Sequence, residues 1–211
     1  MTIRTFIFNP FMELTYVVSD DSNNAVIIDC GCRTEKEQQQ LLHYIDGNNL
    51  RPIALLNTHF HLDHQFGNAL INRRYGLIPY GSELDRPLLD TVDAQCGWFG
   101  IEPNGETIKD IHPVTDGQQL DFDGIRFEVI STPGHTPGGV CYLLKRDGEP
   151  DVLFSGDTLF CGGMGRTDLP YGNYGDLIDS IQNKLMLLSP DTIVCPGHGV
   201  KTTIGNEMTC Y

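Results

Sequence analysis

The sequence predicts an α+β fold in which two β-sheets pack face to face and helices cover their outer faces. Short apolar runs separated by turn residues recur along the 211 residues, as is typical of a strand-rich protein. Helical patterns are interspersed among these runs, and a hydrophobic content of 40% is enough to form a sizeable core. Because no linker-like tract interrupts the chain, we expect residues 1–211 to form a single domain.

Eight segments have the apolar composition of strands. Residues 26–28 and 55–56 are continuously apolar, which indicates strands that are buried on both faces. Residues 125–129 alternate between apolar and charged side chains, which indicates a strand with one exposed face. The predicted strands are residues 3–8, 14–19, 25–29, 53–57, 125–131, 139–144, 152–155 and 192–195.

Three helices are predicted between these strands. Thr34 and Glu37 have the spacing of a capping box, and apolar residues with a helical period follow them. A second helix is expected from near Asp63 until just before Gly76, and a third over residues 175–188.

Residues 86–113 show no clear period. They contain the only tryptophan and a glycine-rich turn. We interpret them as a long loop with one short helix, and loops of this length are often functional.

Composition limits the classes of partner. A formal net charge of −14 disfavours nucleic acid, because phosphate binding requires a basic surface. The N-terminus lacks a secretory pattern, and no apolar run is long enough to span a bilayer. Seven cysteines, several within apolar runs, indicate reduced and mostly buried thiols, so we expect a cytoplasmic protein. A metal or redox pair formed by Cys30 and Cys32 is the less favoured alternative.

The strongest functional signal is the segment THFHLDH at residues 58–64. It places His59, His61, Asp63 and His64 directly after an apolar run, so that a strand delivers them to a sheet edge. Imidazole and carboxylate groups suit zinc or iron. One ion cannot comfortably use all four side chains from so short a stretch, so we expect two ions. A histidine-rich surface turn, with Asp63 capping a helix, is the simpler interpretation.

Three further ligand-type residues follow predicted strands, each directly after a glycine. They are His135, Asp157 and His198. Each alone would be an ordinary turn or loop residue, but their recurrence favours several strand ends that converge on one rim. His43 and His112 lie outside these motifs, and we interpret both as surface residues.

These motifs resemble those of the metallo-β-lactamase superfamily, and within it the glyoxalase II-like (hydroxyacylglutathione hydrolase-like) branch of short, single-domain type. THFHLDH, TPGHTPGG, SGDTLF and PGHG are similar to that family's metal motifs in order, and GRTDLP and KTTIGNE resemble segments of its short members. The resemblance implies a four-layer αββα sandwich with two metal ions at one sheet edge. It also implies that one ion is held by His59, His61 and His135, the other by Asp63, His64 and His198, and that Asp157 bridges them.

The same resemblance implies a hydrolase of a thioester such as S-lactoylglutathione. Two divalent ions, two carboxylates and a bridging hydroxide keep about one positive charge, which lowers the pKa of bound water toward roughly 7. Zinc is the expected metal, and iron or mixed iron and zinc also suit these ligands. Asp63 is the candidate catalytic residue because the motif places it beside the hydroxide. Thr58, Thr136 and Thr158 flank ligands and are candidates for orienting them.

Arg166 and Tyr171 are the candidate substrate contacts. We interpret Arg166 and Asp168 first as an ion pair that braces their loop, and alternatively Arg166 as a contact for a substrate carboxylate. The chain ends 13 residues after His198. We therefore expect it to lack the C-terminal helical domain with which full-length glyoxalase II helps to bind glutathione, so another thiol carrier is also open.

Other functions must be weighed. A persulfide dioxygenase would use one iron on His59, His135 and Asp157, a two-histidine, one-carboxylate set. The PGHG and TTIG segments are more similar to the hydrolases. A catalytically idle metal-binding scaffold is disfavoured by the complete ligand set. We expect a small-molecule thioester as the partner, with no nucleic acid and no membrane, and the sequence does not predict the oligomeric state.

Overall fold

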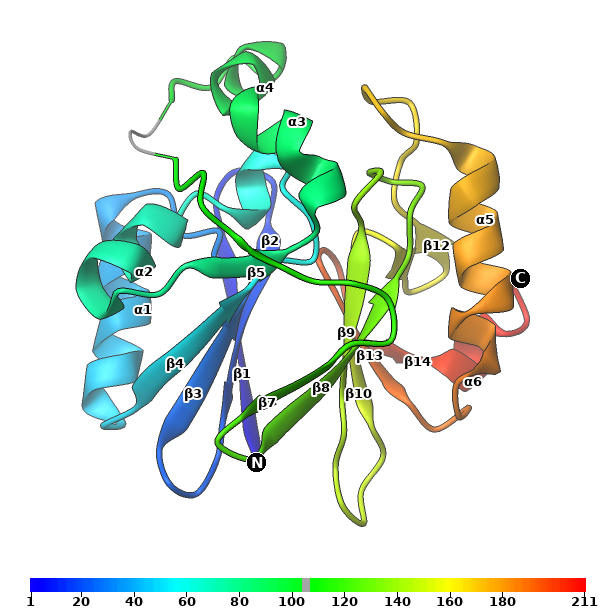
Figure 1. Ribbon diagram of the computed structural model, residues 1–211, viewed down its shortest axis with the longest axis horizontal. Helices are drawn as coiled ribbons and strands as arrows, with labels where there is room; N and C mark the ends of the chain where they lie inside the picture. The colour runs from blue at the N-terminus through cyan, green and yellow to red at the C-terminus, as the bar shows by residue number, and fades with distance from the viewer. Residues whose placement is uncertain (104–106) are drawn as a thin grey trace. The chain divides into compact units, whose positions relative to one another are not determined.

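The computed structural model describes residues 1–103 and 107–211. The chain divides into two compact units, residues 1–113 and 114–211, and each contains one six-stranded sheet among its described residues (Figure 1). The prediction of a single domain stays a prediction. Within the described part of the chain, no helix is both long enough and apolar enough to cross a membrane.

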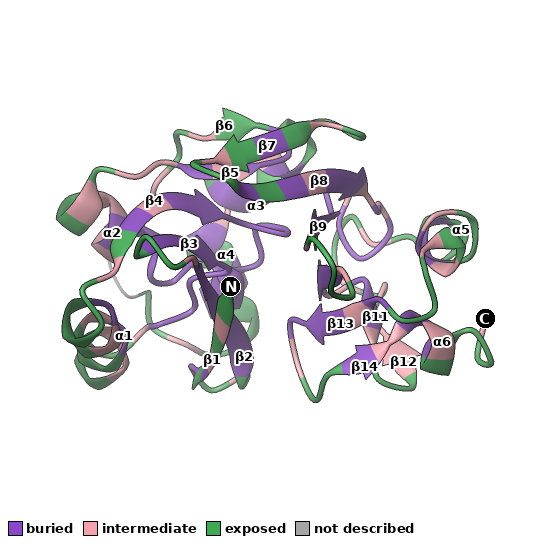
Figure 2. Cartoon of the chain, turned by 90° about the horizontal axis from the view of Figure 1, so that it is seen from below, coloured by how far each residue is buried: buried purple, intermediate pink, exposed green. Residues whose placement is uncertain are grey.

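The sheet of the first unit has the strand order β1-β2-β3-β4-β5-β6. Its first three strands pair antiparallel, and the later neighbours pair parallel. The strands are β1 (Thr2–Phe8), β2 (Glu13–Ser19), β3 (Asn24–Ile28), β4 (Arg51–Leu56), β5 (Pro79–Gly81) and β6 (His112–Pro113). The first four were predicted, whereas β5 and β6 are too short to carry a periodic signal. As expected, β3 is buried along its whole length (Figure 2).

Helices α1 (Glu35–Gly47) and α2 (Asn68–Tyr75) cover one face of this sheet (Figure 1). The predicted capping box of α1 is confirmed, since the Thr34 side chain accepts from Glu37 N and the Glu37 side chain accepts from Thr34 N. A buried apolar cluster joins strands and helices, and it includes Phe6, Val17, Ile27, Leu41, Ile45, Leu55 and Ile71.

The predicted start of the second helix near Asp63 is wrong. Only a 3-10 turn (Leu62–His64) forms there, and α2 begins at Asn68. The reason is that backbone carbonyls in this segment accept hydrogen bonds from side chains rather than from the N–H groups of a helix. Asn57 Nδ2 donates to His64 O at 2.7 Å, and Gln65 Nε2 donates to Phe60 O at 2.6 Å.

The prediction of one short helix within residues 86–113 is also wrong. Two short helices, α3 (Arg86–Asp90) and α4 (Val92–Trp98), follow one another. Pro87 lies in the first turn of α3, where its missing N–H has no helical partner to lose. The predicted glycine-rich turn falls partly on residues 104–106, which lie outside the described residues.

The sheet of the second unit has the strand order β14-β13-β10-β9-β8-β7. β10 and β13 pair parallel, and the other neighbours pair antiparallel. The strands are β7 (Gln119–Phe122), β8 (Ile125–Ser131), β9 (Val140–Leu144), β10 (Val152–Gly156), β13 (Ile193–Pro196) and β14 (Thr202–Thr203). A small two-stranded sheet consists of β11 (Leu159–Phe160) and β12 (Gly163–Met164).

Helices α5 (Tyr174–Asn183) and α6 (Ile204–Glu207) complete this unit. The predicted helix over 175–188 is too long, because a 3-10 turn (Leu185–Leu187) follows α5. Lys184 leaves helical geometry, and its Nζ donates to Ser131 O at 2.8 Å and to Asp116 Oδ2 at 2.9 Å. The buried cluster of this unit includes Leu143, Leu153, Leu177, Ile181, Leu185, Val194 and Ile204.

Candidate metal centre

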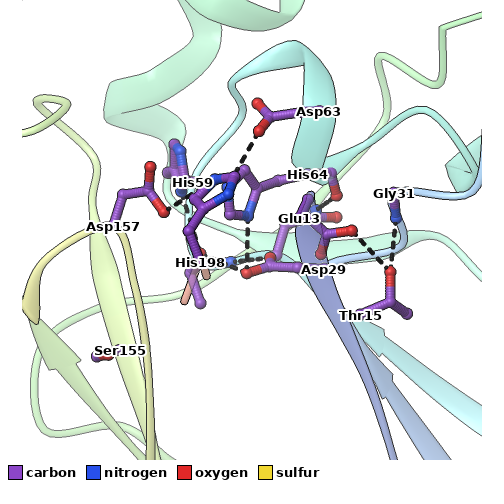
Figure 3. Close-up of polar contacts among 12 residues, drawn as sticks. Glu13, Thr15, Asp29, Gly31, His59, Asp63, His64, Ser155, Asp157 and His198 are labelled. Carbon is purple, nitrogen blue, oxygen red and sulfur yellow. Dashed lines mark hydrogen bonds and ion pairs between the residues drawn. The ribbon is translucent and has the colours of Figure 1, made fainter. Parts of the chain in front are cut away.

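The first unit gathers three histidines directly after β4. The ring centroids of His59 and His61 lie 4.9 Å apart, and those of His59 and His64 lie 4.1 Å apart. All three side chains are buried, as is Asp63. Asp63 Oδ2 lies 3.7 Å from His64 Nε2 (Figure 3). Three imidazoles and a carboxylate in so small a volume form a nitrogen- and oxygen-rich donor set, the type that suits zinc or iron.

A buried aspartate supports these ligands from behind. Asp29, at the end of β3, has Oδ2 3.1 Å from His64 Nδ1 (Figure 3). The same carboxylate accepts bonds from the Thr58 backbone N at 2.8 Å and from Thr58 Oγ1 at 2.7 Å. Thr58 Oγ1 in turn lies 3.1 Å from His59 Nδ1. Because Nδ1 of His59 and Nδ1 of His64 both have partners on this side, the Nε2 atoms of the two rings are the ones presented for a metal. This arrangement is common among histidine ligands.

Side-chain amides fix the backbone of the same loop. Gln95 Oε1 accepts from Leu62 N at 3.0 Å, and Asn9 Nδ2 donates to Asp63 O at 3.0 Å. Both amide side chains are buried. The loop is therefore held on several sides, as a preorganised site requires.

The second unit places its three predicted ligands around one carboxylate. Asp157 Oδ2 lies 3.5 Å from His135 Nε2, and Asp157 Oδ1 lies 3.6 Å from His198 Nε2. Asp157 directly follows β10, and His198 lies two residues beyond β13. Each carboxylate oxygen of Asp157 therefore faces a different histidine.

The tautomer of His135 follows from its hydrogen bond. Nδ1 lies 2.7 Å from the Arg166 backbone carbonyl, which only accepts, so Nδ1 carries the proton and Nε2 carries the lone pair. Gly165 makes this approach possible. A Cβ added there would meet Asp157 O at 1.9 Å and His135 Nδ1 at 3.0 Å.

The candidate substrate contacts lie in the segment that follows. Arg166 and Asp168 form a two-point ion pair, with Nε–Oδ1 at 2.6 Å and Nη2–Oδ2 at 2.8 Å. The Arg166 guanidinium lowers the pKa of the exposed Asp168 carboxyl to about 2. The pair predicted to brace this loop is thus present. Tyr171 is 52% exposed and has a left-handed φ of 72°. Its role and that of Arg166 toward a substrate stay predictions.

Glu13, Cys30 and Cys32 are further buried titratable side chains of the first unit. Burial raises the pKa of the Glu13 carboxyl well above its usual range, although His64 opposes this shift. The Sγ atoms of Cys30 and Cys32 lie 3.7 Å apart, and their hydrogen bond, together with burial, raises the pKa of the Cys30 thiol well above its usual range. A raised pKa keeps the Cys30 thiol protonated, which disfavours metal binding and redox exchange at Cys30. The expected burial of most thiols holds for five of the seven, whereas Cys161 and Cys210 are exposed.

Other predicted residues are placed as follows. Thr158 Oγ1 bonds Thr132 Oγ1 at 2.8 Å, so it ties the turn after β10 to the turn after β8. His43 and His112 are exposed, as predicted for surface residues. The supporting residues Asn9, Asp29 and Gln95 were not predicted, because their only signal in the sequence is a polar side chain beside an apolar run.

The class of the protein is now clear. The sequence profile of the metallo-beta-lactamase superfamily matches residues 8–198, and the chain belongs to this superfamily. The family implies bound divalent metals, and the donor sets fit them: imidazoles with Nδ1 engaged, and a carboxylate with one oxygen toward each of two histidines.

Two relatives are similar to this chain over almost its whole length. The chain is 38% identical to hydroxyacylglutathione hydrolase GloC of Haemophilus influenzae over 208 residues, which is 98% of this chain and 95% of GloC. It is 33% identical to the crystal structure of BLEG-1 B3 metallo-beta-lactamase, with a TM-score of 0.86 over 99% of this chain and 97% of that one. The predicted metallo-β-lactamase-type α+β fold is thereby confirmed.

Two further structures show how varied these relatives are. TTHA1623, in a di-iron-bound form, is 33% identical with a TM-score of 0.82 over 97% of this chain and 96% of that one. ETHE1 from Myxococcus xanthus is 27% identical with a TM-score of 0.77 over 98% of this chain and 81% of that one. Since a hydrolase, a lactamase and ETHE1 all share this fold, the fold alone does not select a substrate.

Proposed function

We propose that the protein is a dinuclear metallohydrolase that cleaves a thioester such as S-lactoylglutathione. The observation that carries the dinuclear part is the geometry of Asp157, whose two oxygens lie 3.5 and 3.6 Å from different histidine Nε2 atoms. A carboxylate that served a single ion would not need a histidine at each oxygen. The thioester part is supported by the likeness to GloC across nearly the whole of both chains.

The ligands would divide between two ions. Following the family's motifs, one ion would be held by His59, His61 and His135, and the other by Asp63, His64 and His198, with Asp157 shared. Two bound divalent ions would supply a nucleophile by lowering the pKa of a water molecule toward roughly 7. Zinc is the proposed metal, and the di-iron relative makes iron an equally direct candidate to test.

The side chains have separate tasks in this proposal. Asp63 handles the proton of the attacking water, since its backbone is held by Asn9 and its carboxylate lies within 3.7 Å of His64 Nε2. Arg166, with its exposed guanidinium, contacts a carboxylate of the thiol carrier, and Tyr171 contacts the substrate beside it. A thiolate is a good leaving group, so the site needs no strong general acid.

A persulfide dioxygenase is the second candidate, and the likeness to ETHE1 is the observation compatible with it. That enzyme would need one iron on His59, His135 and Asp157. It would leave Asp63 and His64 without a metal to bind. The complete second set of ligand-type side chains therefore favours the hydrolase.

The deciding experiment is an anaerobic assay of metal-analysed protein against S-D-lactoylglutathione, with thioester loss as the signal. We expect turnover without oxygen in wild-type protein and in the surface variant His43→Ala, two metal ions per chain, and a large loss of turnover in His59→Ala. Oxygen uptake with glutathione persulfide, with one iron per chain and no thioester loss, would replace the hydrolase by the dioxygenase. Two bound ions with silence in both assays would exclude glutathione as the carrier.

A further inference from the structure

Asn9 lies in the turn between β1 and β2, far from the metal motif in sequence and next to it in the first unit. Its side chain is buried, and its φ of 52° is left-handed. Asn9 Nδ2 donates to the backbone carbonyl of Asp63 and to that of Gly31, both at 3.0 Å. One side chain thus ties the loop that carries Asp63 to the loop that follows Asp29.

The orientation of this amide is determined by its partners. Asn9 Oδ1 accepts from Phe11 N at 3.0 Å, so the oxygen must face Phe11 and the NH₂ group must face the two carbonyls. Both hydrogens of the amide are used, and both acceptors are carbonyls. Only a side chain with two donors on one nitrogen satisfies this arrangement, and an aspartate of the same shape would present an oxygen to two oxygens.

The turn is itself anchored to a helix. The Asn9 backbone N donates to Glu37 Oε1 at 2.7 Å, and Glu37 Oε2 accepts from the backbone of Thr34 and Arg33 at the start of α1. A Cβ on Gly31 would meet Asp63 O at 2.6 Å, so the two loops that Asn9 joins are in close contact. The position of Asp63 is therefore tied through Asn9 to the rigid end of a helix.

We infer that Asn9 is a positioning residue for Asp63, and that its amide keeps Asp63 in metal-binding geometry. This inference rests on the proposed assignment of Asp63 to a metal ion, but not on the identity of the substrate. Partners that orient ligands from outside the coordination sphere commonly change metal affinity 10–100-fold when they are removed.

Two substitutions distinguish the effect of the Asn9 amide from the effect of the backbone conformation of the turn. Asn9→Asp keeps the shape and removes both donors. Asn9→Gly removes the side chain at a residue with positive φ, where glycine is favoured, so the turn itself is relieved of strain. Asn48→Asp is the matched control, because Asn48 Nδ2 also donates to a carbonyl, that of Tyr44 at 2.8 Å, at the exposed end of α1.

The measurement is metal affinity by chelator competition, with metal per chain counted at each step and folding of the apo forms followed by circular dichroism and urea unfolding. We expect Asn9→Asp and Asn9→Gly to release one of the two ions about 10–100-fold more readily than wild-type protein, while the other ion and Asn48→Asp behave as wild type. If Asn9→Asp does not fold, Asn9→Gly decides.

Either folded Asn9 variant with wild-type affinity for both ions would overturn the inference, and so would an equal loss in Asn48→Asp. Wild-type protein that binds both ions but leaves thioesters intact would refute the proposed function alone. The metal readout separates the two failures, because it does not depend on turnover.

Discussion

The imidazole of His135 has its tautomer set by a single backbone carbonyl, that of Arg166. That carbonyl is held in place because Gly165 packs against Asp157 with no room for a side chain. The segment GRTD is therefore important through its backbone as well as through the Arg166 guanidinium. The sequence resemblance pointed to the charged residues Arg166 and Asp168, whereas the contacts point to Gly165.

Gly165→Ala tests this role. The added Cβ would meet Asp157 O at 1.9 Å, so the segment must move away from His135. We expect metal affinity to fall about 10–100-fold and stability to fall by about 1–3 kcal/mol from overpacking. Gly163→Ala is the control, since its Cβ would have no neighbour within 4 Å. Chelator competition and urea unfolding measure both effects, and equal behaviour of the two variants would contradict the assignment.

At the scale of one element, the first turn of helix α1 contains the Glu37 carboxylate, which also binds a segment outside the helix. Glu37 accepts three backbone N–H groups, from Asn9, Arg33 and Thr34. Partial burial raises the pKa of this carboxyl, but the bonds from Thr34, Asn9 and Arg33 outweigh it and lower the pKa from 4.5. The charged form is thus favoured by folding.

Glu37→Gln should therefore destabilise the metal-free protein in a pH-dependent way. At pH 7 we expect a loss of about 1 kcal/mol, the usual effect of removing an N-terminal cap. Because the folded pKa lies below the unfolded value of 4.5, the advantage of wild type is complete above that pH. It is lost as the pH falls through the lower folded pKa. Urea unfolding at several pH values measures this, with Glu35→Gln as the control, and a difference that grows toward acid pH would contradict it.

The elements that were predicted correctly are those in which the apolar residues of the sequence pattern are also the buried residues of the structure. Val26–Ile28 read as a buried strand and are one, with every residue of β3 buried. By contrast, β7 (Gln119–Phe122) is half polar and is defined by its pairing with β8. The start of α2 was misplaced because the backbone around Asp63 bonds to side chains from distant segments. No local pattern could reveal those partners.

The candidate site likewise contains residues that the sequence could predict and residues that it could not. The seven ligand-type residues stand in short motifs next to strands, so a reading along the chain finds them. Asn9 and Asp29 act on ligands 54 and 35 positions away, at Asp63 and His64, through single contacts. Such contacts have no period and no spacing rule, and they become visible only once the β1–β2 turn and the end of β3 are placed.

At the scale of the whole molecule, the proposed ligands are spread along the chain from His59 to His198, so bound metal should stabilise the folded chain against unfolding. If metal binds only the folded chain, a free concentration about 1,000-fold above Kd stabilises it by about 4 kcal/mol. For a chain of this size that corresponds to a rise in Tm of roughly 8–16 °C. Removal of metal by a chelator should reverse the rise.

Variants of single proposed ligands test the assignment of two ions. His61→Ala removes a proposed ligand of one ion, and His198→Ala removes a proposed ligand of the other. We expect each to remove roughly half of the rise in Tm, since each would weaken one of the two proposed ions and leave the other, while His43→Ala keeps the full rise. The measurement is thermal unfolding with and without added metal. A full rise in His198→Ala would mean that His198 holds no ion, and the proposed ligand set of Asp63, His64 and His198 would then be wrong.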